Sequence, residues 1–383
     1  MGTQPLVSAP TKLATIAAVA VLAASCGGSP SSQANNVSNK TPTPGASPSP
    51  SASASVAPSA SPSPPPVTGA FGVLYGSQAA ASYSVSIVGV DGKVVASAQV
   101  STPALASCAN AAAAVVSPPL STSNSSVYFE DAQGAIHYLR PTGETGTATT
   151  VPAPSASRRS MFTVSPDDSR IAVIVDDFNS SGAATRLYVE NLSGGGNHVD
   201  LFSETGAYSL WPIGWHGTNN LVLAKAAACT QGGGPFCCGP LELHVVDPAT
   251  ANRRFTLGNS SSCVIVGPPS PSGVACETDS FTTAHVMDWT ARTFASMTIP
   301  GPEFIYLSPA SNVEAMIDNN GTSFNGQGLV NLPGMFMCTW IDDSHVLSGG
   351  DAQHQPRVAD VHTGAMVPVA AQGDCGGRLP GGL

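Results

Sequence analysis

The sequence has few charged residues and very few basic ones. Only 10% of its 383 residues are charged, and 14 Lys and Arg against 24 Asp and Glu give a formal net charge of −10. Binding to nucleic acid requires clustered Lys and Arg that neutralise phosphates, so we expect no nucleic-acid partner. The G-x-S-x-G, H-E-x-x-H and phosphate-binding glycine-loop patterns are also missing, and we assign no catalytic residue.

Proline and glycine, in contrast, are abundant. The chain has 33 Pro and 39 Gly besides many Ser and Thr. These residues favour turns and interrupt helices, so long helices are not expected after the N-terminal segment. Short strands joined by turns are expected instead.

The N-terminal segment has the features of an export signal. Lys12 precedes the apolar run "LATIAAVAVLAA" at 13–24, which is too short to span a bilayer core of ~30 Å. The run ends in "LAASC" at 22–26, which resembles the bacterial lipobox, although Ala23 stands where that family usually has Leu. We therefore expect 1–25 to be a lipoprotein signal peptide and Cys26 to carry the lipid. An ordinary secretory signal with an incidental Cys is the alternative.

Residues 26–68 are expected to form a spacer. After Cys26 the tract is rich in Pro, Ser and Ala and has almost no large apolar side chains, so it cannot bury enough surface to offset its chain entropy. About 42 residues at ~3.1 Å each give a maximum reach of roughly 130 Å. A lipid-anchored Cys followed by a disordered tether predicts a folded head held on the extracytoplasmic side of a membrane.

Of the nine cysteines, eight remain once Cys26 is set aside, and an even number in an exported chain favours disulfides. Cys263 and Cys276 are placed symmetrically about a Pro-Ser turn, and we expect them to be bonded across two antiparallel strands. Cys229 with either Cys237 or Cys238 would close a glycine-rich loop. Metal binding by these thiols is the alternative, although no C-x-x-C spacing supports it.

The chain from about residue 69 repeats one pattern. An apolar strand meets a polar Ser-Pro or Trp-containing turn and a second apolar strand follows, as in "VSPDDSRIAVIVDD" (164–177) and "YLSPASNVEAMI" (306–317). Another strand then ends in an Asp, Pro or Gly turn, as in "LHVVDPAT" (243–250). Repeated units of about four short strands predict a β-propeller, whose blades bury their faces against neighbouring blades.

The Ser-Pro-Asp turn followed by "RIAVIV" and "RLYVENLSGG" resembles the blades of TolB-type and related WD-type propellers. This resemblance implies an all-β propeller domain over 69–383. We expect seven four-stranded blades, near 70–103, 112–151, 161–202, 210–257, 263–299, 304–333 and 338–371. The first blade lacks an obvious innermost strand. A C-terminal strand could supply it and close the ring, but "QGDCGGRLPGGL" (372–383) has a poor strand sequence, so six blades are an alternative. A β-sandwich is the other alternative.

The repeat also predicts a binding face. In a four-stranded meander the first and third turns lie on one face, and the second turn and the crossover to the next blade lie on the other. The long insertions fall at second turns, at 176–185, 225–240, 318–328 and 349–356, and loops on a rigid scaffold commonly carry binding. The polar residues expected on this face are Asp176, Asp177, Asn179, Asp318, Asn319, Asn320, Asp351 and His354.

These side chains include oxygen ligands suited to Ca²⁺, but the loops lack a spaced-carboxylate pattern. We expect no cofactor, leave a structural Ca²⁺ open, and assign no metal ligand. Trp211, Trp215 and Trp340 are expected to pack between blades rather than to line a sugar-binding surface.

The leading functional hypothesis is a membrane-anchored lipoprotein whose propeller is a binding or scaffold module for an envelope protein or glycan. The alternative is a cell-envelope hydrolase or lyase with its active site in the propeller channel. Such a site would draw residues from several blades and would need no linear motif.

Overall fold

The computed structural model describes residues 63–107, 114–115, 120–180, 182–228, 235–236, 240, 242–278, 280–301, 304–310, 313–351 and 353–383. The expected signal peptide, Cys26 and most of the spacer lie outside these residues. All regular elements in the described part of the chain are β-strands. No helix among the same residues is long and apolar enough to cross a membrane.

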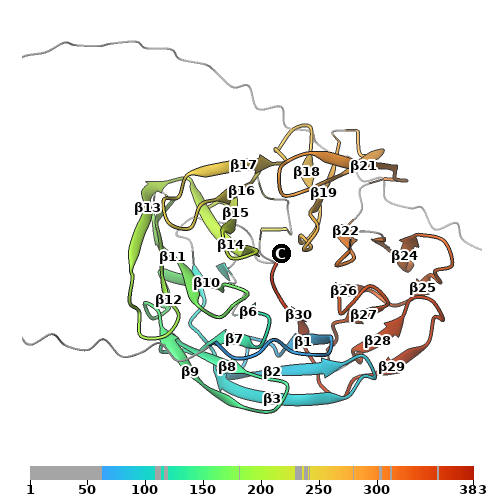
Figure 1. Ribbon diagram of the computed structural model, residues 1–383, viewed down its shortest axis with the longest axis horizontal. Helices are drawn as coiled ribbons and strands as arrows, with labels where there is room; N and C mark the ends of the chain where they lie inside the picture. Colours follow the sequence, from blue (N-terminus) through green and yellow to red (C-terminus); the bar gives the residue numbers. More distant parts are fainter. Residues whose placement is uncertain are drawn as a thin grey trace, which may run out of the picture. The chain divides into compact units, whose positions relative to one another are not determined.

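The described strands form seven four-stranded antiparallel sheets arranged as blades around a centre (Figure 1), which confirms the expected propeller. Blade 1 contains β30 (Asp374–Leu379), β1 (Phe71–Tyr75), β2 (Ser82–Gly89) and β3 (Val94–Ser101). Blade 2 contains β6 (Leu120–Thr122), β7 (Val127–Glu130), β8 (Ala135–Leu139) and β9 (Thr145–Thr150). Blade 3 contains β10 (Arg158–Val164), β11 (Arg170–Asn179), β12 (Gly182–Asn191) and β13 (Val199–Gly206).

Blade 4 contains β14 (Tyr208–His216), β15 (Asn220–Ala227), β16 (Glu242–Val246) and β17 (Arg253–Leu257). Blade 5 contains β18 (Val264–Ile265), β19 (Val274–Glu277), β20 (Thr283–Met287) and β21 (Thr293–Thr298). Blade 6 contains β22 (Phe304–Leu307), β23 (Glu314–Asp318), β24 (Gly321–Asn325) and β25 (Leu332–Pro333). Blade 7 contains β26 (Met337–Trp340), β27 (His345–Ser348), β28 (Arg357–Asp360) and β29 (Met366–Pro368), and the pair β4 (Ala106–Ser107) and β5 (Ala114–Val115) lies outside the blades.

Strand β11 shows why the apolar strand of the repeat has apolar residues at successive positions. Ala172 and Ile174 belong to an apolar cluster shared with blade 4. Ile171, Val173 and Val175, which alternate with them, belong to a cluster shared with blade 2. Because successive side chains of a strand point to opposite faces, a strand packed between two neighbouring blades needs apolar residues on both faces.

The Ser-Pro-Asp turn of blade 3 also contacts blade 2. Asp168 has a φ of 58°, a left-handed conformation that Asp tolerates better than most residues. Its carboxylate accepts hydrogen bonds from the hydroxyls of Ser125 (2.8 Å) and Tyr128 (2.7 Å) in blade 2. The polar turn between the two apolar strands therefore joins neighbouring blades.

The tryptophans have the predicted packing role. Trp215 and Trp340 are buried, and each indole N–H donates to a backbone carbonyl of the innermost strand of the preceding blade. Trp215 bonds Thr163 O at 3.3 Å and Trp340 bonds Tyr306 O at 3.0 Å. The two residues are equivalent in the repeat because each joins its own blade to the previous one.

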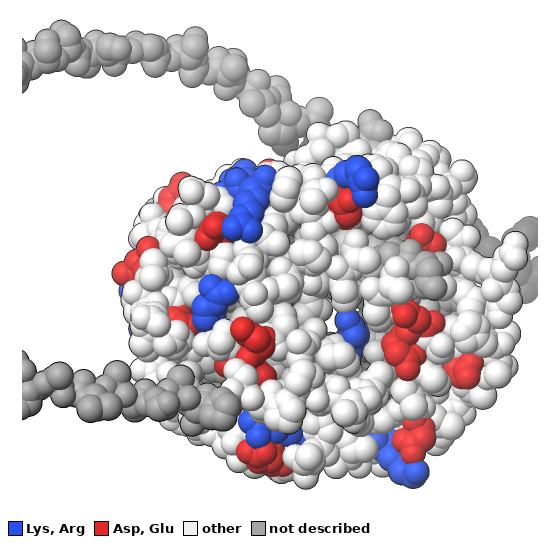
Figure 2. Space-filling model, in the orientation of Figure 1, with Lys and Arg blue, Asp and Glu red and all other residues white. Residues whose placement is uncertain are grey.

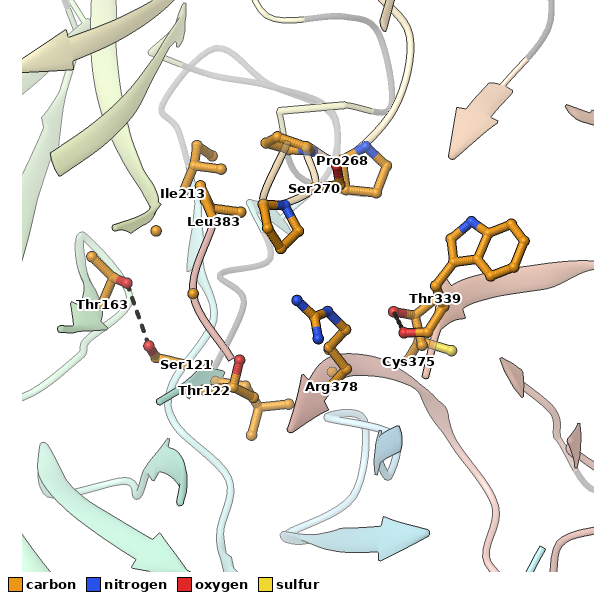
Figure 3. Close-up of a pocket in the computed structure, with 18 of the residues that line it drawn as sticks. Ser121, Thr122, Thr163, Ile213, Pro268, Ser270, Thr339, Cys375, Arg378 and Leu383 are labelled. Atoms are coloured by element: carbon orange, nitrogen blue, oxygen red, sulfur yellow. Dashed lines mark hydrogen bonds between the residues drawn. The ribbon is translucent and has the colours of Figure 1, made fainter. Parts of the chain in front are cut away.

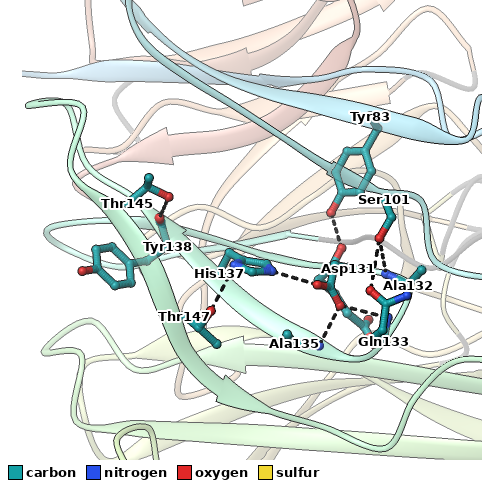
Figure 4. A network of polar contacts seen from close by, with 11 residues as sticks. Tyr83, Ser101, Asp131, Ala132, Gln133, Ala135, His137, Tyr138, Thr145 and Thr147 are labelled. Carbon is teal, nitrogen blue, oxygen red and sulfur yellow. Dashed lines mark hydrogen bonds and ion pairs between the residues drawn. The ribbon is translucent and has the colours of Figure 1, made fainter.

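Polar groups join blades 1 and 2 at a second position (Figure 4). The hydroxyl of Tyr83 donates to Glu130 O at 2.5 Å, and Ser101 Oγ accepts a hydrogen bond from Ala132 N at 3.2 Å. Asp131 fixes the second turn of blade 2 by accepting the backbone N–H of Gln133 and of Ala135. These contacts align the end of blade 1 with the next blade.

The ring closes through its C-terminal strand. β30 pairs with β1 in antiparallel register, with Leu379 opposite Phe71 and Asp374 opposite Tyr75, and it is the innermost strand of blade 1. Closure by a C-terminal strand is thus confirmed, and the segment forms this strand despite its poor strand sequence because its glycines are required by local geometry. Gly377 has a φ of 113°, where other residues are strained, and this strand gives seven blades rather than six.

Two disulfides are present among the described residues. Cys263–Cys276 confirms the predicted pairing. The strand register places Ile265, not Cys263, opposite Cys276, and a shift of two residues leaves both cysteines on one face of the sheet. Cys338–Cys375 was not predicted and joins β26 of blade 7 to the closing strand β30. The proposed pairing of Cys229 with Cys237 or Cys238 lies outside the described residues.

We expect the two disulfides to contribute differently to the free energy of unfolding. The double substitution Cys338→Ser/Cys375→Ser should lower the free energy of unfolding by roughly 2–4 kcal/mol, because the bond restricts a longer stretch of the unfolded chain. The pair Cys263→Ser/Cys276→Ser, whose residues are 13 apart rather than 37, is the matched control and should lose less by about 1 kcal/mol. Guanidinium unfolding measures both, and an equal or smaller loss for the first pair would contradict this role for the closing bond.

Candidate functional site

The strand order defines two faces of the ring. The turn face carries the first and third turns of the blades, and the crossover face carries the second turns and the connections between blades. The described chain enters at the turn face, where Val67 N donates to the carbonyl of Asn124 in the first turn of blade 2 (2.8 Å). The crossover face is therefore opposite the point at which the spacer joins the head.

A hollow on the crossover face lies at the seam between blades 1 and 7. This seam cleft, with a volume of about 890 Å³, is lined by the second turn of blade 1, by the 349–356 loop of blade 7 and by the segment that leads into β30. Gly350 and Gly373 exchange backbone hydrogen bonds of 2.9 Å, so the loop and the closing segment form one wall. The cleft exists because the ring closes at this position.

Two predicted residues, Asp351 and His354, line the seam cleft. Asp351 Oδ1 accepts the backbone N–H of Gln353 and of His354 at 2.8 Å, and these hydrogen bonds lower the pKa of its carboxyl. The His354 ring contacts the same oxygen at 3.1 Å, while 79% of the His354 side chain and 68% of the Asp351 side chain stay exposed. The loop conformation is thus fixed internally, and both side chains are accessible to a ligand.

The closing strand contributes a second carboxylate to the seam cleft. Asp374, the first residue of β30, is exposed and lies opposite Tyr75 in the strand register. Burial, and secondly the charge of Asp374, raise the pKa of Tyr75 to about 12. The Tyr75 hydroxyl is therefore a neutral hydrogen-bonding group at physiological pH, and the negative charge of the cleft resides on Asp351 and Asp374.

Residues 318–328 do not form a long loop. Asp318 ends β23, Asn319 and Asn320 form a tight turn, and β24 follows immediately at Gly321. Asp318 accepts the backbone N–H of Asn320 at 2.7 Å. The three predicted residues are exposed on the crossover face in blade 6, but they do not line the seam cleft. The expectation of a long insertion here was wrong because the polar sequence "GTSFN" forms the third strand.

Residues 176–185 also form strands rather than an exposed loop. β11 continues to Asn179 and β12 begins at Gly182, so only a tight turn separates them. Asn179 is exposed at the end of β11. Asp177 forms an ion pair with Arg158 at 2.7 Å near the surface. Of the remaining expected insertion at 225–240, residues 229–234 and 237–239 lie outside the described part of the chain.

Asp176 is fully buried, so the expectation that it lies in an exposed loop was wrong. Its carboxylate contacts the Arg159 guanidinium at 2.5 Å and accepts the Thr185 hydroxyl at 2.6 Å. The Arg159 guanidinium in turn stacks on the Trp211 ring, 4.2 Å from its centroid. Burial raises the pKa of the Asp176 carboxyl, and the adjacent Arg159 charge opposes that rise. This pair holds blades 3 and 4 together and is closed to a ligand.

A second hollow, of about 280 Å³, opens at the centre of the ring on the turn face. We call it the channel pocket. Its walls come from the innermost strands of most blades and from the last residues of the chain. The pocket could not be predicted from the sequence, because its lining residues are spread over 120–383 and only the ring brings them together.

No group of three or more potential metal-ligating side chains is found within the described residues. The carboxylates of Asp318 and Asp351 accept hydrogen bonds from their own turns, which accounts for the acidic and amide residues in these loops.

Comparison with known proteins finds only remote structural similarity. No protein-family model matches this chain, and no curated protein sequence matches it. TolB from Acinetobacter baumannii is 12% identical with a TM-score of 0.38 over 82% of this chain and 66% of the TolB chain, so this chain spans slightly less than two thirds of it. Apo AztD from Citrobacter koseri is 10% identical with a TM-score of 0.49 over 82% of this chain and 98% of AztD. A prolyl endopeptidase is 12% identical with a TM-score of 0.36 over 76% of this chain and 39% of that one.

The contrast between Asp176 and Asp177 gives a prediction about stability. Asp176→Ala should lower the free energy of unfolding by about 3–5 kcal/mol, because the buried charge of Arg159 loses its partner. Asp177→Ala is the matched control, since its ion pair with Arg158 is about 40% exposed and should contribute about 0–1 kcal/mol. Urea unfolding of both variants measures the difference, and similar losses would show that Asp176 has no special structural role.

Proposed function

We propose that this chain is a lipid-anchored extracytoplasmic binding module that holds an envelope protein or glycan in the seam cleft. The observation that carries the proposal is the cleft itself, because a hollow of about 890 Å³ is within the range of ligand sites on proteins. Its exposed polar residues come from loops that the closed ring holds in place.

The charge of the cleft favours one kind of ligand. Asp351 and Asp374 place two exposed carboxylates at the seam, and the whole chain has a formal net charge of −10. An acidic site on an acidic protein attracts cationic partners and speeds their association. We therefore favour a basic segment of an envelope protein as the ligand over a neutral glycan.

Three features support the location. The two disulfides suit an oxidising compartment, "LAASC" resembles a lipobox, and the Pro/Ser/Ala-rich spacer separates Cys26 from the head. The described chain enters at the turn face, and the seam cleft lies on the opposite, crossover face.

The anchor is tested at Cys26. Cys26→Ser should move the protein from the membrane fraction to the soluble fraction, because serine has no thiol to accept the lipid. Ser31→Ala, a substitution of similar size in the spacer, is the control and should leave the protein in the membrane fraction. Fractionation followed by mass spectrometry of the N-terminal peptide measures the result, and membrane retention of Cys26→Ser would contradict lipid anchoring.

The cleft is tested by capture from an envelope extract. The double variant Asp351→Ala/Asp374→Asn should capture its partner about tenfold less tightly, because two exposed ion pairs contribute up to about 1 kcal/mol each. The control is Asp318→Ala/Asn320→Ala, which alters the same face in blade 6 outside the cleft. Quantified pull-down with the anchor and spacer intact measures both. Equal capture by the two variants would contradict binding at the seam cleft.

A further inference from the structure

The channel pocket contains a cation that no other described residue neutralises by direct contact. Arg378 of β30 lines the pocket, and Figure 2 shows basic atoms within the hollow at the centre of the turn face. Figure 3 shows the Arg378 side chain extending into the pocket rather than along a wall. Among the described residues, the Arg378 guanidinium has neither a hydrogen bond nor an ion pair.

This situation is unusual within the molecule. The other arginines that are at least partly buried in the described chain all contact an oxygen. Arg159 pairs with Asp176, Arg158 with Asp177, Arg140 with Glu144, and Arg170 with the carbonyl of Thr218. A guanidinium has five N–H donors in a rigid fork, and withdrawing it from water without a partner is costly. The Arg378 guanidinium can therefore gain hydrogen-bond partners when a ligand binds.

The surroundings of Arg378 keep it charged. Burial lowers its pKa, and the carboxylates of Asp343 and Asp342 oppose that change. Both carboxylates are already engaged, since Asp343 accepts the backbone N–H of Ala310 and Asp342 accepts that of His345. They act on Arg378 through space and leave its donors open. Their negative charge also weakens the attraction of the pocket for an anion. Removing one of these charges should therefore strengthen anion binding.

Apolar side chains lie on the opposite wall of the pocket. Ile213, Leu383 and Pro268 lie across the pocket from the Arg378 guanidinium (Figure 3). The segment that ends in Leu383 is held in place, because Gly381 N donates to Ser123 O (2.6 Å) and Leu383 N donates to Trp215 O (2.7 Å). The main-chain oxygen of Leu383 contacts His216 Nδ1 at 2.8 Å. The pocket of about 280 Å³ thus has a cationic side and, opposite it, fixed apolar side chains.

We propose that the channel pocket binds a small organic carboxylate, with its carboxylate on Arg378 and its apolar body against Ile213, Leu383 and Pro268. The planar guanidinium matches a carboxylate with two parallel hydrogen bonds. The small volume excludes a folded partner and admits either a free organic acid or the carboxyl end of a peptide. The pocket lies on the turn face, on the side of the ring opposite the seam cleft.

The test uses the full chain in detergent and calorimetric titration with benzoate, with benzamide as the uncharged analogue of the same shape. Benzoate should bind the unmodified protein, and benzamide should bind about tenfold less tightly because it lacks the charge. Arg378→Gln should lose benzoate binding by about tenfold as well, and Arg378→Lys should retain part of it, because a lysine keeps the charge but not the fork. Arg186→Gln, which removes an exposed arginine of β12, should bind benzoate normally.

Asp343→Asn is the second variant, and it keeps the oxygen that accepts the Ala310 N–H. It should bind benzoate more tightly, because one opposing negative charge is removed. This gain does not depend on whether the Arg378 variants fold. Unchanged benzoate binding by folded Arg378→Gln, weaker binding by Asp343→Asn, or no binding of benzoate to the unmodified protein would each overturn the proposal.

The two sources of the carboxylate are distinguished with N-acetylphenylalanine and its amide. Tighter binding of N-acetylphenylalanine than of benzoate, lost on amidation, supports the carboxyl end of a peptide as the natural ligand. Tighter binding of benzoate supports a free organic acid. Binding of the amide as tightly as the acid would overturn the role of Arg378.

Discussion

The pairing of β30 with β1 is the contact on which the rest of the structure depends. It brings together the first and last strands of the propeller domain, and it converts a row of blades into a ring in which every blade has two neighbours. Each blade is thin and has apolar residues on both faces, so an unclosed row would leave one face of blade 1 and one of blade 7 exposed. The Cys338–Cys375 bond fixes β30 to blade 7, and closure is thus held by a sheet on one side and by a covalent bond on the other.

The remaining interfaces repeat a few contacts. Apolar side chains of each blade pack on the next, and one cluster extends over blades 3, 4 and 5. Polar groups set the alignment, through the indole N–H of Trp215 and Trp340 and the carboxylate of Asp168. Stability in such a repeat is the sum of blade and interface contributions.

The repeat was predictable from sequence, because alternating apolar residues and polar turns reflect burial on two faces. Two strands were not evident from the sequence, and the reason is specific. The strands "GTSFN" and "DCGGRL" have weak strand propensity, and they form because neighbouring strands supply their hydrogen bonds, which a single sequence does not show. Gly377 lowers the propensity of β30, yet its φ of 113° is what the closing strand needs.

The prediction that Asp176 lies in an exposed loop was wrong, although the sequence pattern indicated that it is buried. It continues the period-two series of Ala172, Ile174 and Phe178, all of which face blade 4, and a carboxylate in such a series implies a buried cation such as Arg159. Arg378 gave no comparable signal. Its significance depends on the absence of a partner in three dimensions, and this becomes visible only when residues of six other blades surround the channel.

The two hollows are linked by the same strand. Asp374 at the beginning of β30 lines the seam cleft and Arg378 lines the channel pocket. Four residues of extended strand span about 13 Å, and Cys375 between them is bonded to blade 7. A strand held in this way does not shift at one end alone. The ring closure that creates the seam cleft therefore also sets the position of the Arg378 guanidinium, so a chain in which β30 fails to dock loses both sites together.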